Sequence, residues 1–65
     1  MYWVRFEFTF QNERFHDFLG PFDDYYFAML YCVQMGEVPY MHGITPVHVE
    51  KAKILNEYEY AVATD

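Results

Sequence analysis

Residues 23–36 read DDYYFAMLYCVQMG, and this stretch predicts one helix with a start signal and a stop signal. Asp23 or Asp24 can accept hydrogen bonds from the free N–H groups of a first helical turn, and Gly36 can adopt the left-handed conformation that closes a helix. Between these ends almost every side chain is apolar or aromatic, which leaves no charged stripe for solvent. We therefore expect this helix to be mostly enclosed by a sheet or a partner.

Upstream of this helix, residues 1–10 alternate between two faces, which is the pattern of a half-buried strand. Gln11 and Asn12 suit a turn after it. We expect this strand to contact the central helix through its apolar face, whose members are Tyr2, Val4, Phe6, Phe8 and Phe10.

The stretch between this strand and the central helix is less regular. Residues 13–19 fit about two helical turns, because large apolar side chains recur there at spacings of three and four: Phe15, Phe18 and Leu19. The glycine and proline that follow at 20–21 are expected to end this short helix.

The second half of the chain gives weaker signals. After the central helix we expect a loop or a short edge strand. Thr45 and Pro46 form a good helix opening, so residues 46–55 are interpreted as a second helix. The alternation of Val47 and Val49 supports a strand in the same place, and this alternative stays open.

The last nine residues, 57–65, alternate again and predict a strand, with Tyr58, Tyr60 and Val62 on one side. Pairing with the first strand would place these side chains over the central helix. The fold class expected is α+β: one domain over residues 1–65, with a small, mainly antiparallel sheet packed on one central helix and a second short helix.

Composition excludes several classes of protein. Ten acidic and four basic side chains give a net charge of −6, which argues against direct binding to nucleic acid or anionic lipid. Aromatic residues make up 23% of the chain and are large enough to give a short domain a core. Cys32 is the only cysteine, so we expect a small buried apolar side chain without a disulfide. The first residues lack a signal peptide, and no apolar run approaches the roughly 20 residues of a membrane span, so we expect a cytoplasmic protein.

No motif indicates an enzyme. The three histidines, at 16, 42 and 48, do not match a recurrent zinc spacing, and a buried Cys32 would be inert. The glycines are isolated, so no phosphate-binding loop is present. Neighbouring acids at 23–24 and 57–59 leave a small hydrolase or metal enzyme as a third interpretation, but the chain has little material to wall a pocket. We expect no catalytic residue, no metal and no cofactor.

The acidic residues are the remaining candidates for function. Carboxylates a few ångströms apart can imitate the phosphates of DNA, and a protein that grips DNA with Lys and Arg could bind them instead. Exposed tyrosines beside the acids would add rigid contact area. The partner-binding residues that this hypothesis predicts are Asp17, Asp23, Asp24, Glu37, Glu57, Glu59, Tyr25 and Tyr40.

In general character the chain resembles the small acidic proteins that phages encode against bacterial defence, in particular anti-CRISPR proteins that block DNA binding by a type I surveillance complex. It is short, acidic, rich in aromatic residues and without an enzyme motif. These families share no sequence motif, so no residue role is transferred. The resemblance implies a DNA-mimicking inhibitor, in the cytoplasm of a bacterial host, that occupies a basic nucleic-acid channel. The alternative is a structural module that homodimerises or joins an assembly through apolar surface.

Overall fold

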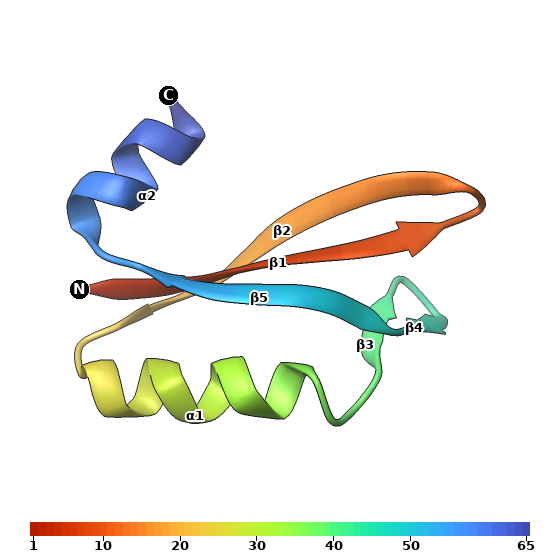
Figure 1. The fold of residues 1–65 in the computed structure, drawn as a ribbon, viewed down its shortest axis with the longest axis horizontal. Helices are drawn as coiled ribbons and strands as arrows, with labels where there is room; N and C mark the ends of the chain where they lie inside the picture. Colours follow the sequence, from red (N-terminus) through yellow and green to blue (C-terminus); the bar gives the residue numbers. More distant parts are fainter.

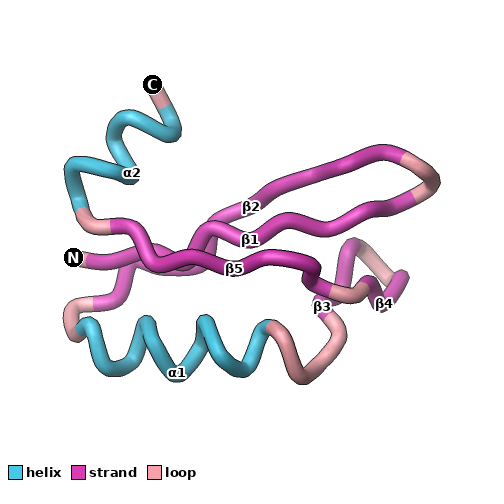
Figure 2. Tube along the Cα trace, viewed as in Figure 1, coloured by secondary structure: helices cyan, strands magenta, loops and turns pink.

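The computed structural model describes residues 1–65 and has an α+β fold, as the sequence predicts. Three strands form one antiparallel sheet in the order β2-β1-β5, and two short strands form a hairpin beside it (Figure 1). A helix lies on each side of the sheet, α1 on one and α2 on the other (Figure 2). The elements are β1 (Tyr2–Phe10), β2 (Glu13–Phe22), α1 (Tyr25–Met35), β3 (Tyr40–His42), β4 (Thr45–Val47), β5 (Val49–Leu55) and α2 (Glu57–Thr64).

The inner face of the sheet, which we define as the face that carries Val4, Phe6 and Phe8 of β1, forms the core. These three side chains are at most 2% exposed, which confirms the alternating pattern of the first strand. Phe6 and Phe8 form a buried cluster with Val47 and Val49. Side chains of the same face on β2 and β5, together with Met35 and Tyr40, pack around them.

The outer face of the sheet carries the other residues of β1 and is covered at one end by α2. Tyr60 of α2 stacks on Trp3, with ring centroids 4.0 Å apart, and meets the ring of Phe18 edge-on at 5.2 Å. Leu55 lies opposite Trp3 in the sheet and is 4% exposed. The two faces therefore have separate aromatic contacts, one for each helix.

The helix expected at residues 13–19 is wrong, because these residues belong to β2. Gln11 and Asn12 have positive φ angles of 52° and 66°, the geometry of a two-residue hairpin turn that matches the twist of antiparallel strands. The hairpin divides the apolar side chains between the faces: Phe15 lies against Phe8 on the inner face, and Phe18 meets α2 on the outer face. Apolar spacings of three and four in so short a segment therefore do not distinguish a helix from a strand.

The helix expected at residues 46–55 is also wrong, and the strand alternative is confirmed. Thr45–Val47 forms β4, which pairs with β3, and Val49–Leu55 forms β5, which pairs with β1. The physical reason is the central strand. Its second edge of N–H and C=O groups needs a partner, and β5 supplies one while burying Val49 and Leu55 at its two ends.

The strand expected at residues 57–65 is wrong as well, because Glu57–Thr64 forms α2. The Asn56 side chain accepts a hydrogen bond from the backbone N–H of Glu59 at 2.9 Å. The Glu59 carboxylate in turn accepts one from the backbone N–H of Asn56 at 3.0 Å. This reciprocal capping box stabilises the first turn and outweighs the alternation of the following residues.

The central helix is confirmed in position but is not enclosed. Asp24 caps it by accepting a hydrogen bond from the N–H of Tyr26 at 2.8 Å, and α1 ends at Met35. Gly36 closes it in a right-handed conformation, φ −81°, rather than the left-handed one expected. Only Ala28 of α1 is buried, because a three-stranded sheet covers one side of a helix and nothing in the chain covers the other. Cys32 is half-buried, and this partial burial raises the pKa of its thiol.

Candidate functional site

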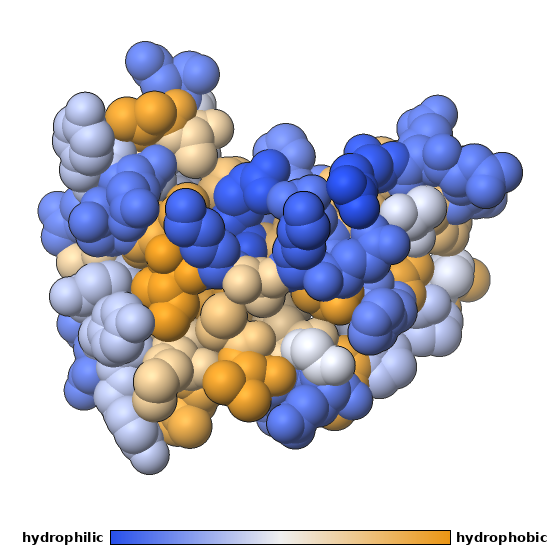
Figure 3. Space-filling model, viewed as in Figure 1, coloured by the Kyte–Doolittle hydropathy of each residue, from blue (hydrophilic) through white to orange (hydrophobic).

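Helix α1 carries an exposed apolar surface that the sheet leaves uncovered, which we call the α1 surface. Its side chains are between 39% and 59% exposed, and they are Tyr25, Tyr26, Phe27, Met29, Leu30, Tyr31 and Val33. Figure 3 shows hydrophobic and neutral side chains over α1 along the lower edge of the molecule, whereas hydrophilic ones gather over the sheet. Monomeric proteins rarely leave a contiguous apolar surface of this kind without a use for it.

Two hollows flank the C-terminal half of α1. The first, the β3 hollow, lies between α1 and β3, has a volume of about 290 Å³, and is lined in part by Leu19, Met35 and Met41. The second, the helix hollow, lies on the α1 surface itself, has a volume of about 580 Å³, and is lined in part by Leu30 and Val33. Tyr31 and Gln34 line both hollows and so form the ridge between them.

All four basic side chains lie on the outer face of the sheet, away from α1. Arg5 lies opposite Lys53 and Glu7 lies opposite Lys51 across the β1 and β5 strands, and residues opposite each other share a face. The fourth base, Arg14 of β2, reaches Glu7 from the other side. Because residues 15–50 contain no Lys or Arg, the α1 side carries carboxylates without a matching lysine or arginine.

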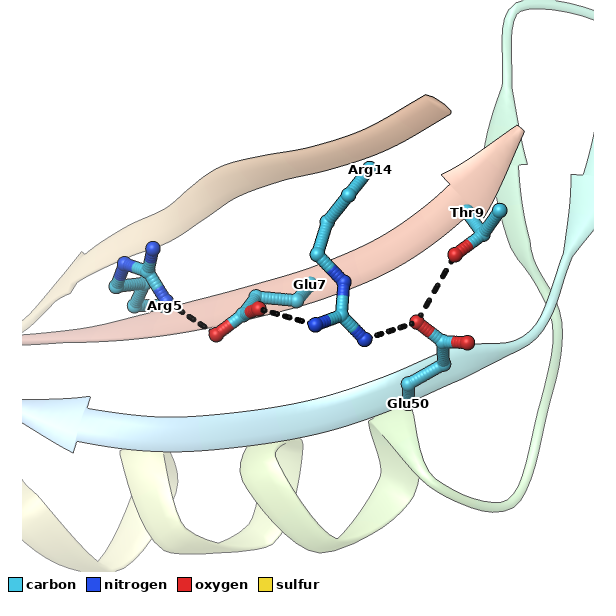
Figure 4. A network of polar contacts seen from close by, with 5 residues as sticks. All are labelled: Arg5, Glu7, Thr9, Arg14 and Glu50. Carbon is cyan, nitrogen blue, oxygen red and sulfur yellow. Dashed lines mark hydrogen bonds and ion pairs between the residues drawn. The ribbon is translucent and has the colours of Figure 1, made fainter. Parts of the chain in front are cut away.

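The outer-face charges neutralise one another in a network (Figure 4). Glu7 accepts a hydrogen bond from Arg5 at 2.7 Å and lies 3.9 Å from Arg14. Glu50 accepts hydrogen bonds from Arg14 and from Thr9, each at 3.1 Å. The bond from Arg5 lowers the pKa of Glu7, and the bonds from Arg14 and Thr9 lower the pKa of Glu50. The carboxylates of Glu7 and Glu50 are therefore already bonded to side chains of the sheet.

Four of the six predicted acids lie on the chain segment that has no basic residue. Asp23 and Asp24 precede α1, and Glu37 follows it, so both ends of the α1 surface are acidic. Asp24 is partly engaged as the helix cap, whereas the carboxylates of Asp23 and Glu37 make no hydrogen bond or ion pair. Asp17 of β2 accepts hydrogen bonds from the N–H of Phe18 at 2.8 Å and from the hydroxyl of Tyr40 at 3.3 Å.

The other two predicted acids, Glu57 and Glu59, lie on α2 at the opposite face of the sheet and serve that helix. Glu57 binds the amino group of Met1 at 2.6 Å, and this hydrogen bond lowers the pKa of the carboxyl group. Glu59 belongs to the capping box. Residues 57–64 form α2 rather than a strand beside β1, so the strand pairing that would place Glu57 and Glu59 on one sheet face with Glu7 does not occur.

The two tyrosines predicted to bind a partner differ in their exposure. Tyr25 is 53% exposed on the α1 surface and contacts Tyr2 edge-on at 5.4 Å. Tyr40 is half-buried, with its ring against Phe6 and Phe8. Burial, followed by the charge and hydrogen bond of Asp17, raises the pKa of the Tyr40 hydroxyl. Tyr25 is thus available to a partner, and Tyr40 mainly joins the hairpin to the core.

No group of three or more His, Cys, Asp or Glu side chains has a geometry that could hold a metal ion. His42 is instead surrounded by rings, at centroid distances of 5.1 Å from Phe8, 4.8 Å from Phe10 and 5.5 Å from Phe15. Neither helix has the length and apolar content to cross a bilayer.

No protein-family model, curated protein or solved structure matches the chain. The residues that sequence reasoning missed are the exposed apolar ones of α1, chiefly Phe27, Leu30 and Val33. The signal was present, because a helix without a charged stripe in so short a chain has more apolar side chains than one small sheet can cover. The sequence predicts the side chains of the central helix to be mostly enclosed, whereas the structure places them at the surface.

Proposed function

We propose that this chain is a non-enzymatic inhibitor that binds, through the α1 surface, a basic nucleic-acid-binding surface of a larger protein or complex. The observation that carries the proposal is the combination of apolar side chains along α1 with acids at both of its ends and no Lys or Arg from residue 15 to residue 50. A cationic partner with apolar patches complements such a surface in both charge and hydrophobicity.

The acids of the outer face of the sheet and those of the α1 side differ in whether a basic side chain neutralises them. The outer face neutralises its own acids with Arg5 and Arg14, whereas Asp23 and Glu37 on the α1 side have no cation beside them. Carboxylates without a partner are free to attract Lys and Arg of another protein, and they would compete there with the phosphates of DNA. The proposed binding residues are therefore Asp17, Asp23, Asp24, Glu37 and Tyr25, joined by the apolar side chains of α1.

A competition experiment tests this function. Type I surveillance complexes, which the resemblance to anti-CRISPR proteins indicates as first targets, are incubated with labelled target DNA and increasing amounts of the chain. We expect the chain to displace the DNA, and we expect its apparent affinity to fall as salt is raised. DNA binding that is unchanged at saturating concentrations of the chain, across a panel of such complexes and other basic nucleic-acid-binding proteins, contradicts the proposal.

Two matched pairs of variants locate the binding surface. Replacing Asp23 and Glu37 by their amides removes two exposed charges on the α1 side and should weaken binding about two- to thirtyfold, since exposed ion pairs contribute roughly 0.2–1 kcal/mol each. The control replaces Glu13 and Asp65, which are also exposed and unpaired, and should change affinity less than about twofold. Equal effects of the two pairs would mean that net charge, rather than this surface, determines binding.

The second pair tests the apolar part. Val33→Ser on α1 and Val62→Ser on α2 change side chains of nearly equal exposure, 59% and 62%. Val33→Ser should weaken binding by about tenfold or more, as buried interface positions do, and Val62→Ser should leave it unchanged. Both variants should keep the fold, because neither side chain is part of the core.

The second candidate function is an assembly module that pairs with itself through the α1 surface, and the exposed apolar side chains favour it. Sedimentation at two protein concentrations separates the candidates. A dimer that persists in high salt and dissociates in Val33→Ser would support self-assembly. A monomer at both concentrations would exclude self-assembly at those concentrations and is what we expect from the acids at both ends of α1.

A further inference from the structure

The two hollows beside the C-terminal half of α1 form a divided apolar site. The ridge between them consists of Tyr31 and Gln34, which are three residues apart on the helix and therefore neighbours on its surface. The β3 hollow opens on one side of this ridge and the helix hollow on the other. A partner that straddles the ridge can place one apolar side chain in each hollow.

The hollows are apolar inside and acidic at their rims. Leu19 and Met35 line the β3 hollow, and Tyr40, which also lines it, is hydrogen-bonded to the carboxylate of Asp17. Leu30 lines the helix hollow, and Glu37 belongs to its lining. Each hollow thus combines an apolar wall with one nearby carboxylate, and no Lys or Arg lines either of them.

We propose that this divided site binds a basic amphipathic helix of a partner protein, an inference that rests on the proposed function and identifies the partner's secondary structure. Two apolar side chains of the bound helix, three or four residues apart, occupy the two hollows. Helices pack by fitting a ridge of one into the groove between side-chain rows of another, and the Tyr31–Gln34 ridge presents such a surface. Lys or Arg beside the anchors then meet Asp17 and Glu37.

Charge identifies the occupant as a different protein rather than a second copy of the chain. Asp23 and Asp24 lie at the start of α1, and Glu37 lies just after its end. Two copies of α1 placed side by side would therefore bring acids against acids in either direction, whether the helices run parallel or antiparallel. Like charges placed together at an interface disfavour such a pair, whereas a basic helix relieves the repulsion.

The test uses the full chain, labelled with ¹⁵N, and three synthetic peptides of about 18 residues, longer than the roughly 12–15 residues below which isolated helices are marginal in water. The first contains Leu on one face and Lys on the rest. The second has the same composition with Leu distributed around the helix, and the third replaces Lys by Glu. We expect the first peptide to bind, with the largest amide shift changes at Tyr31, Gln34 and Met35. The second and third should bind at least about tenfold more weakly.

Two variants of the β3–β4 hairpin test the β3 hollow. Met41→Ser alters the lining of the β3 hollow, whereas Ile44→Ser changes the fully exposed side chain at the β3–β4 turn, which lines neither hollow. Met41→Ser should weaken binding of the first peptide about fivefold or more, and Ile44→Ser should not. Unchanged amide spectra outside the β3–β4 hairpin confirm that both variants are folded.

The failure of this inference is distinguishable from failure of the proposed function. Equal binding of the amphipathic and scrambled Lys peptides, or shift changes centred on α2, would overturn the divided site while leaving charge-based inhibition in place. An absence of peptide binding would overturn it too. The proposed function is judged separately, by whether the chain displaces DNA from a basic complex.

Discussion

The indole ring of Trp3 and the phenol ring of Tyr60 lie parallel, with centroids 4.0 Å apart and an angle of 3° between their planes. This contact joins the first strand of the sheet to the last helix of the chain. Phe18 of β2 contacts the same tyrosine, so the ring of Tyr60 contacts side chains from two strands. α2 has no buried residue, and Tyr60 makes both of its aromatic contacts with the sheet.

Tyr60→Ala should therefore release α2 from the sheet. Aromatic pairs contribute about 0.5–1.5 kcal/mol beyond the area that they bury, so we expect a loss of about 1–2 kcal/mol in the free energy of unfolding. Trp3 is the only tryptophan, and its fluorescence should shift toward the red as its ring becomes exposed. Tyr58→Ala, at a side chain that is 78% exposed on the same helix, is the control and should change neither quantity.

Gly20 is required where β2 passes Trp3. Its φ angle is 141°, and a Cβ atom there would lie 2.9 Å from Cδ1 of Trp3 and 3.0 Å from the carbonyl oxygen of Tyr2. Gly20→Ala should cost about 1–3 kcal/mol in thermal or denaturant unfolding, because strain and a close contact add. Gly36→Ala is the matched control: its φ is −81° and the nearest atom is 3.6 Å away, so stability should be equal or slightly higher.

Ala28 is the one buried residue of α1, and its side chain is fully buried. Ala28→Leu should push the helix from the sheet and destabilise the protein by about 1–3 kcal/mol, as over-packing does. Ala61→Leu makes the same change at an exposed position of α2 and should be neutral. A stability of Ala28→Leu equal to that of the wild type would show that α1 is held more loosely than this contact implies.

The outer-face network should make the free energy of unfolding depend on pH in the acidic range. The pKa values of Glu7 and Glu50 lie below their ordinary value of 4.5, so the unfolded chain binds more protons than the folded one near that pH. Their stabilisation is present above the unfolded-state pKa and is lost as pH falls through the folded-state values. Urea unfolding from pH 6 downward should show the loss (about pH 4.5 and below).

Variants assign this pH dependence to the network. Glu7→Gln should flatten the acid side of the stability profile, because one shifted carboxyl group is removed. Glu13→Gln, at an exposed residue of β2 that makes no ion pair, should leave the profile of the wild type unchanged. A profile for Glu7→Gln that has the wild-type slope would locate the acid sensitivity elsewhere.

The two strongest local patterns in the sequence were sufficient to predict one strand and one helix. The alternation in residues 1–10 and the caps around residues 25–35 each correspond to the element predicted. The failures occurred where one pattern fits two structures. Phe15, Phe18 and Leu19 fit a helix face, but in β2 they divide between the two faces of the sheet, and only the partner strand decides that.

The prediction of a strand at residues 57–65 failed for a different reason. Alternating Tyr58, Tyr60 and Val62 favoured a strand, whereas Asn56 followed three residues later by Glu59 is the sequence of a capping box. The capping-box sequence is the stronger of the two signals in this segment. For the candidate site, sequence identified the acids around α1 but not their separation from Glu57 and Glu59, because that depends on α1 and α2 lying on opposite faces of the sheet.

The central position of β1 has a consequence for how the molecule is made. One neighbour, β2, follows it immediately, whereas the other, β5, is translated only after α1 and the small hairpin. A nascent chain can therefore close the first hairpin while the second edge of β1 remains unpaired, and unpaired edges promote aggregation. Truncation before residue 55 would leave that edge open permanently, so the last third of the polypeptide protects its first strand.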